Sequence, residues 1–338
     1  MKMFSGIKLL AAFCVLGCTL EAVAADDPEE KGNIGRGHIT VPSLSPGHLL
    51  RPSVVISKLT RSRKGEVELS STVTWGNVWN YRENVFVYDA ELVRFDTKLT
   101  WALSDGIKVG VLVPVSGRIG GAADEVIEDF HRALGLGDAD RPARPRDEIL
   151  IEITNAEGET FRRDEKYWGI NDIPVFVTVL LTEGDACWPA AGLTFGGSVP
   201  VGDDEELFGV GEPVFGCGAL ASKRLNPTSA HIVTAGASFT FTPRDELAGI
   251  RLERVELAGL LGWEWQCSES VSVLGQYAVH SPVAKDFFEL ADPIHELNLG
   301  VKWDLSDHAQ LEFSVTENLF AFNNSTDFGA HFGITVDL

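Results

Sequence analysis

Asp129, His131 and Arg141 are the polar residues whose types and spacing come closest to a chemical site. The arginine can pair with a carboxylate, while the imidazole can bind a ligand or gate an opening. The simpler interpretation is a salt-bridged helix that fixes a loop, because charged helix faces are usually structural. The sequence leaves both interpretations open and favours the structural one.

Two acidic features could bind cations. Glu317 stands next to Asn318 at the end of a candidate strand, so we expect it to point inward or to lie at a rim. In a water-filled pore it could select cations, or it could pair with a basic neighbour. The run from Asp203 to Glu206 could hold a divalent cation through oxygen ligands, although such runs are more often solvated loops.

Motifs of catalysis and of cofactor binding are missing from the sequence. There is no Gly-x-Ser-x-Gly, no Gly-x-x-x-x-Gly-Lys-[Ser/Thr] and no His-Glu-x-x-His. The eight histidines show no ligand spacing, so we expect no metal, no cofactor and no enzymatic activity. A hydrolase built from neighbouring strands is the minor alternative, and it would use Ser272, Ser314 and His280.

The N-terminus has the pattern of an export signal. Two lysines precede an apolar run from Leu9 to Leu20, and Ala22 and Ala24 offer small residues to a signal peptidase. Residues 1–24 are therefore expected to be a cleaved signal peptide. A lipoprotein box ending at Cys18 is the alternative processing route.

The formal net charge of −21 bears on the expected partners. It argues against nucleic acid, which needs a basic face, and against peripheral docking on anionic lipid. Three cysteines follow the signal, Cys187, Cys217 and Cys267. We expect free and mostly buried thiols, because the proposed strand pairing places Cys217 opposite a residue near 195 rather than opposite Cys187.

From residue 66 onward, apolar residues recur at period two, which is the period of a β-strand. The runs suit tilted membrane strands better than the short strands of a soluble sandwich, which is the competing fold. We expect about twelve strands, within a range of about ten to fourteen. They are placed near 66–81, 85–101, 106–116, 173–182, 190–200, 212–223, 229–242, 249–265, 269–280, 294–303, 308–319 and 327–338.

Alternate connections between these strands are short and the others are mostly long, which is typical of an outer-membrane barrel. The pattern predicts an all-β, closed, antiparallel, up-and-down transmembrane barrel over residues 66–338, preceded by a Pro/Gly-rich arm over residues 25–65. The longest loop, residues 117–172, predicts a helix over 125–134 and a hairpin around 156–158.

Tryptophans near the proposed strand ends, among them Trp79, Trp101 and Trp303, are expected to form an interfacial girdle. The alternation also predicts a polar inward face, made of Glu66, Glu68, Thr72, Lys108, Glu296, Asn298, Lys302, Gln310, Glu312 and Ser314. An interior of this kind is either a water-filled channel or a plugged lumen.

Several stretches of the chain carry a resemblance to a known family. They are Ile127-Glu128-Asp129-Phe130-His131 with the glycines that follow, Gly169-Ile170-Asn171-Asp172, and Phe313-Ser314-Val315-Thr316-Glu317-Asn318. Together they resemble an uncharacterised bacterial family, domain of unknown function 3187, over about residues 40–338. The resemblance implies a barrel-like fold and brings no known activity.

The leading hypothesis is therefore a cell outer-membrane channel for passive passage of small solutes, with a mild cation preference. A non-conducting barrel that binds a partner or scaffolds the envelope is the competing hypothesis, and the barrel hydrolase is the third. The expected partners are outer-membrane lipid and the barrel assembly machinery. The sequence does not determine the solute or the oligomeric state.

A closed barrel predicts heat-modifiable migration in SDS gels. Its hydrogen-bond ladder has no free edge from which to unzip, so the detergent-extracted mature protein should change its apparent mass only after boiling. Solubility without detergent, combined with no heat shift, would instead indicate a soluble sandwich.

Overall fold

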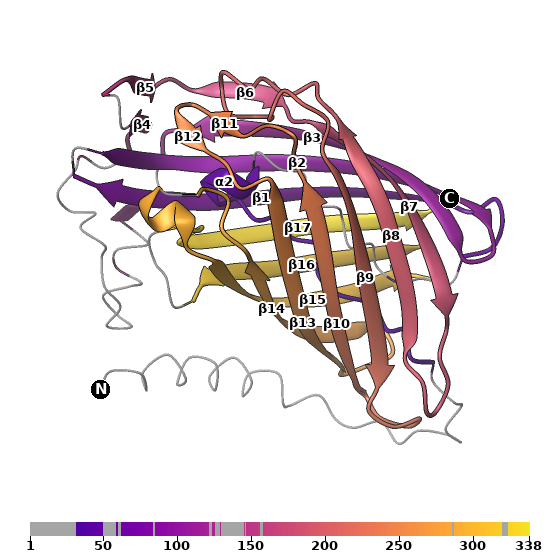
Figure 1. Cartoon of the computed structure of the whole chain (residues 1–338). Coiled ribbons are helices and arrows are strands. Elements are labelled where there is room, and N and C mark those ends of the chain that lie inside the picture. The colour runs from indigo at the N-terminus through magenta and orange to yellow at the C-terminus, as the bar shows by residue number, and fades with distance from the viewer. Residues whose placement is uncertain are drawn as a thin grey trace.

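Figure 1 shows a computed structural model of the chain, in which one large antiparallel sheet curls into a barrel. The structure describes residues 32–49, 59, 62–83, 85–121, 124, 125, 129, 145, 147–155, 158–285, 287–319 and 324–338. The expected signal peptide lies outside these residues.

Twelve of the fifteen strands in the sheet form the ring. The other three are short additions: β4 pairs with one end of β2, β5 pairs with β4, and β6 pairs with one end of β3. Each ring strand pairs with the next one along the chain, and β17 pairs with β1 to close the barrel. The predicted all-β, closed, antiparallel barrel of twelve strands is confirmed. The ring strands are β1 (Val67–Arg82), β2 (Phe86–Ser104), β3 (Ile107–Ile119), β7 (Ile173–Thr182), β8 (Ala190–Val199), β9 (Phe215–Arg224), β10 (His231–Phe241), β13 (Val255–Gln266), β14 (Val271–His280), β15 (Ile294–Ser306), β16 (Ala309–Asn318) and β17 (Phe328–Asp337).

The two rims of the barrel differ in the length of their connections. At the short-turn rim, where β1 begins and β17 ends, neighbouring strands are joined by tight turns. Gly106 in the β2–β3 turn has φ +78°, a conformation that a side chain would disfavour. At the opposite rim, the long-loop rim, the β1–β2 link is short and the other connections are longer, as the sequence predicts.

Short elements cover the long-loop rim. They are β4 (Leu150–Thr154), β5 (Thr160–Arg163), β6 (Tyr167–Ile170), β11 (Glu246–Leu247), β12 (Ile250–Arg251) and the 3-10 helix η2 (Phe288–Ala291). The expected hairpin is present as β4 and β5. Most of the helix expected over 125–134 lies outside the described residues, so the helix-plus-hairpin insertion as a whole is not supported.

Side chains alternate between two environments along the ring strands. Leu261 in the middle of β13 is 56% exposed on the outer face, whereas Ser272 and Ser314 are fully buried on the inner face. The outer face is therefore apolar and the inner face polar, which is the arrangement of a barrel surrounded by lipid. Among the described residues, no helix is long and apolar enough to cross a membrane.

Two expectations about this wall need correction. Trp101 and Trp303 lie exposed near the short-turn rim, but Trp79 is buried near the long-loop rim and belongs to no girdle. The three cysteines are free and Cys217 faces Phe195 as expected, yet Cys187 and Cys217 are exposed. The expectation of buried thiols is wrong for these two, and for Cys217 the reason is that it lies on the outward face of β9.

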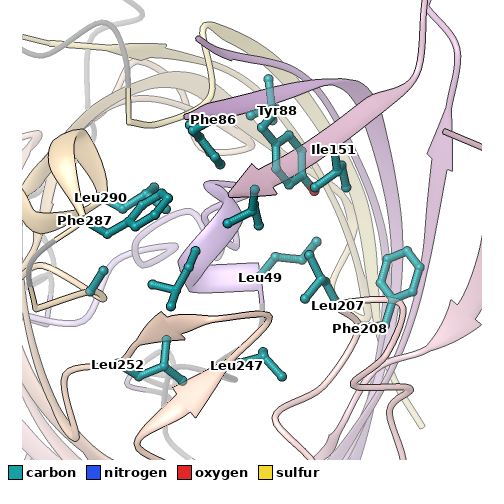
Figure 2. Packing of buried hydrophobic residues seen from close by; sticks show 14 of the residues in the cluster. Leu49, Phe86, Tyr88, Ile151, Leu207, Phe208, Leu247, Leu252, Phe287 and Leu290 are labelled. Atoms are coloured by element: carbon teal, nitrogen blue, oxygen red, sulfur yellow. The ribbon is translucent and has the colours of Figure 1, made fainter. Parts of the chain in front are cut away.

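An apolar cluster fills the inside of the long-loop rim. Figure 2 shows side chains from the strands and from the loops pointing toward Leu49, which belongs to the short helix α2 (Pro46–Leu49) of the N-terminal arm. Burying each large apolar side chain contributes about 1.5–3 kcal/mol. Members from the loops include Leu207, Phe208, Leu247, Leu252, Phe287 and Leu290.

The contact between the outer face and lipid can be tested by placing an arginine at two positions that differ in their depth in the membrane. Leu261→Arg should lower the free energy of unfolding in lipid vesicles by about 2–4 kcal/mol, because the arginine would enter hydrocarbon. Leu225→Arg is the matched control, since Leu225 is 59% exposed but lies in the β9–β10 turn. It should change the free energy by about 1 kcal/mol at most. Equal small effects at both sites would contradict lipid contact on this face.

Candidate functional site

The N-terminal arm, residues 32–49, lies inside the barrel and forms the candidate site together with the wall around it (Figure 1). It starts at the short-turn rim, where the Asn33 side-chain amide donates to the carbonyl oxygens of Asp185 and Trp188 at 2.8 and 3.0 Å. The Arg224 backbone N–H donates to Asn33 Oδ1 at 3.1 Å. These contacts fix the entry of the arm between two turns.

Arg36 is the strongest polar anchor of the arm. Its Nε donates to Asp304 at 2.6 Å, and Nη1 donates to the Ser272 hydroxyl at 2.8 Å. Its backbone N–H donates to Glu264 at 3.0 Å. Because Arg36 is 9% exposed, these charge-assisted bonds are shielded from water and are worth more than surface pairs.

Further along, a glutamine side chain of the wall binds the backbone of the arm. The backbone N–H of Ile39 donates to Gln276 Oε1 at 3.0 Å, and Gln276 Nε2 donates back to the Ile39 carbonyl at 3.1 Å. Gly300 of β15 lets the arm approach, because a Cβ there would lie 2.6 Å from the Ile39 side chain. The wall is therefore shaped to accommodate the arm.

The arm reaches the long-loop rim and later returns. Ser43 donates to Glu296 at 2.9 Å, and Leu49 ends the described segment within the apolar cluster. Leu59 then lies near the short-turn rim, packed with Ala190 and Leu220. The described part of the Pro/Gly-rich arm, residues 32–49, thus occupies the lumen, which the sequence did not indicate.

Opposite charges are matched across the inner wall. Glu68 lies 3.6 Å from Lys98 and 3.9 Å from Lys108, and Arg94 lies 2.8 Å from Asp96. Two strands from β1 around the ring, Glu312 of β16 pairs with Lys302 at 3.1 Å and with His331 at 2.9 Å. Lys302 also donates to the Arg36 and His38 carbonyls, so it links the wall to the arm.

A cavity of about 150 Å³ remains beside the arm. Among its lining residues, five carboxylates stand against three permanent cations. The carboxylates are Glu68, Asp96, Glu256, Glu296 and Glu312, and the cations are Arg94, Lys98 and Lys302. Most residues predicted for the inward face line this cavity or its neighbour at the short-turn rim.

Only one residue of the predicted loop group lies within the described part of the chain. His131 and Arg141 lie outside the described residues, and Asp129 is exposed. Glu317 is the penultimate residue of β16 at the long-loop rim, where it alternates with the buried Thr316 and Asn318. It therefore lies on the opposite face of the strand from the lumen.

Two residues of the acidic run after β8, Asp204 and Glu206, are clamped by arginines. Glu206 pairs with Arg118 at 2.7 Å and with Arg163 at 2.8 Å, and Asp204 pairs with Arg244 at 2.5 Å. These pairs fold the loop over the rim and bring Leu207 and Phe208 into the apolar cluster. The expectation of a solvated loop agrees with the exposed Asp203 and Glu205. It is wrong for Asp204 and Glu206, because cations from three other segments meet these two residues only in the folded barrel.

Asp172 anchors the same loop from beneath. Its two carboxylate oxygens accept the backbone N–H groups of Gly202 at 2.9 Å and Val210 at 3.2 Å. Burial raises the pKa of Asp172 above its usual value, although these N–H groups oppose the rise by stabilising the charged form. The stretch from Gly169 to Asp172, one of those that resemble the family, thus has a structural role.

The hydrolase candidates do not meet. Ser272 and His280 lie eight residues apart on β14, which corresponds to about 26 Å at about 3.3 Å per residue. The Ser272 hydroxyl instead donates to Glu264 at 2.8 Å. His331, the cross-strand neighbour of Ser314, has its ring nitrogens on Thr74 and Glu312. No nucleophile–base pair is formed by the three candidates.

A group of possible metal ligands that sequence spacing did not indicate lines the cavity near the long-loop rim. His48 of α2, Glu256 of β13 and His280 of β14 place one possible ligand atom each within 4.8 Å of one another. The first two are separated by about 200 residues in the chain, and no local period connects them. Only closure of the barrel around the arm brings them together.

The fold and the lumen define the class of protein: a twelve-stranded antiparallel barrel with an apolar outer face and a polar, occupied interior. The chain belongs to the family described as protein of unknown function (DUF3187), whose model matches residues 13–337. No curated protein matches the sequence.

Solved structures are similar to the chain at low sequence identity. The COG4313 outer membrane channel from Pseudomonas putida F1 is 12% identical, with a TM-score of 0.57, over 82% of this chain and 97% of that chain. The NanC porin has a TM-score of 0.46 at 6% identity, over 80% of this chain and 100% of that chain. The Ralstonia pickettii toluene transporter TbuX has a TM-score of 0.41 at 10% identity, over 92% and 99%. The first of these likenesses shows the fold.

The anchoring of the arm can be tested by thiol labelling. In a background without Cys187, Cys217 and Cys267, Ile39→Cys should react slowly with a maleimide, because Ile39 is 1% exposed. Adding Arg36→Ala should raise the labelling rate by about tenfold or more, equivalent to about 1.4 kcal/mol of lost anchoring. Arg63→Ala, at an exposed arginine outside the lumen contacts, should leave the rate unchanged. Fast labelling without Arg36→Ala would contradict the lumenal position of the arm.

Proposed function

We propose that this protein is an outer-membrane channel for small polar solutes whose lumen is held closed by its own N-terminal arm. The observation that carries the proposal is the polar cavity that runs beside the arm, lined by charged groups of both signs. An inner wall of this type stabilises water and dissolved ions, whereas a barrel with a purely structural role can fill its interior with apolar side chains.

A mild preference for cations follows from the charges of the cavity. Its five carboxylates exceed its three lysines and arginines, so a net negative potential acts on a passing solute. Rings of acidic side chains favour cations in pores for the same reason. We place the protein in the outer membrane, with lipid against the apolar outer face, and we expect the barrel assembly machinery to insert it.

The arm supplies the closing element. It contributes buried anchors at both rims, Arg36 near one and Leu49 near the other, and the apolar cluster around Leu49 excludes water from the long-loop rim. Since the arm is covalently attached, its effective concentration at the wall is high even if individual contacts are weak. Passage of a solute then requires the arm to move within the lumen or to leave it.

The same contacts favour a second candidate, a non-conducting barrel that binds a partner or scaffolds the envelope. In that case the arm is a permanent part of the wall, and the loops clamped by Arg118, Arg163 and Arg244 form the functional surface. The two candidates differ in whether removal of the arm exposes a conducting path.

Conductance in planar lipid bilayers separates these functions. The mature protein should show small or rare openings, and a variant lacking residues 32–61 should conduct steadily, because the deletion removes the described arm, residues 32–49, from the lumen. In a salt gradient, the reversal potential of the deletion variant should indicate cation preference, and Glu296→Gln should reduce it.

Heat-modifiable migration provides the control that each variant is folded. A deletion variant that shows the heat shift but never conducts would contradict the channel and favour the scaffold. Steady conductance of the intact protein, equal to that of the deletion variant, would contradict closure by the arm.

A further inference from the structure

We propose that His48, Glu256 and His280 form a binding site for a divalent transition-metal ion of the zinc type, which joins the arm to the barrel wall. His48 belongs to α2 in the arm, whereas Glu256 and His280 stand on the neighbouring wall strands β13 and β14. The proposal goes beyond the channel function and does not depend on conductance.

The three side chains converge on one point. Glu256 Oε1 lies 3.0 Å from His280 Nδ1 and 3.5 Å from His48 Nε2. The two imidazole rings have centroids 4.8 Å apart and an interplanar angle of 70°. The possible ligand atoms, one from each residue, all lie within 4.8 Å of one another, with the carboxylate between the two rings.

These separations suit tetrahedral coordination. Zinc binds imidazole nitrogen and carboxylate oxygen at about 2.0–2.2 Å, so two ligands of one ion lie about 3.4 Å apart. The two distances from Glu256 already fall near this value, and small rotations of the rings would complete the set. Two histidines and one glutamate are also a recurrent ligand set for zinc, with a fourth position left for water or another ligand.

The surroundings support ligation as well. The Ser45 hydroxyl lies 3.1 Å from His48 Nδ1, which orients the ring so that Nε2 faces Glu256. Such a hydrogen bond behind a ligating histidine is the usual device that fixes its orientation. Glu296 lines the same cavity and adds negative charge nearby.

The cavity gives the ion an open position. His48, Glu256 and His280 all line the space beside the arm, so a fourth ligand could enter from the lumen. The site is otherwise shielded, since the His48 and Glu256 side chains are 4% and 2% exposed and that of His280 is 13% exposed. A bound ion would link α2 to both wall strands and hold the end of the arm near the long-loop rim in place.

Metal binding by the folded, detergent-solubilised mature protein tests the site. The protein is stripped with a chelator and titrated with Zn²⁺, and Co²⁺ serves as a spectroscopic probe of tetrahedral ligation. Cys187 and Cys217 are replaced by serine in every sample, because both are exposed and thiolates also bind zinc. Heat-modifiable migration confirms the fold of each variant.

The expected result is one Zn²⁺ per chain, with an upward shift of the unfolding temperature when the ion is bound. His48→Gln, His280→Gln and Glu256→Gln should each weaken binding at least about tenfold, and Ser45→Ala should weaken it by about tenfold through the lost orientation. His295→Gln is the matched control, because His295 bonds Tyr277 on the opposite face of β15 from Glu296 and should leave binding unchanged.

Two results would overturn the proposal. One is the absence of a stoichiometric Zn²⁺ ion in the intact protein, and the other is unchanged affinity in the folded double variant His48→Gln/His280→Gln. If that double variant fails to fold, X-ray absorption of the zinc-loaded intact protein decides instead. Two imidazole ligands support the site, and a spectrum without imidazole refutes it.

Discussion

Ten consecutive residue pairs, from Glu68 with Asp337 to Asn77 with Phe328, join the first strand to the last. This closure removes the sheet edges, so the backbone polar groups of the wall are satisfied within the sheet itself. It also divides the side chains into two sets that cannot mix, because the strand alternates between an enclosed face and an open one. The apolar outer face and the polar lumen both follow from this single constraint.

An enclosed polar face creates a problem of its own, since buried charges are costly unless they are paired. The inner wall solves it by matching opposite charges on neighbouring strands, and the arm completes the matching. Lys302 illustrates this role, because it pairs with Glu312 of the wall and donates to two carbonyl oxygens of the arm. The arm is therefore part of the electrostatic balance of the lumen as well as an obstacle in it.

The long-loop rim is built on a different principle. Arginines clamp the acidic run after β8, and the clamped loop then delivers Leu207 and Phe208 to an apolar cluster around the tip of the arm. Polar contacts thus hold the arm near the short-turn rim, and apolar contacts hold its end near the long-loop rim. Release of the arm from the lumen would therefore require the loss of both kinds of contact.

The sequence by itself determined the number of ring strands and, for β7, both of its boundaries, because period two and turn residues are local properties of the chain. It determined much of the inward face for the same reason. It could not reveal the arm in the lumen, the arginine clamp or the meeting of His48 with Glu256 and His280. Their contacts join residues far apart in the chain and leave no period. Alternation decides which residues share a face, and only closure of the ring decides which faces meet and what lies between them.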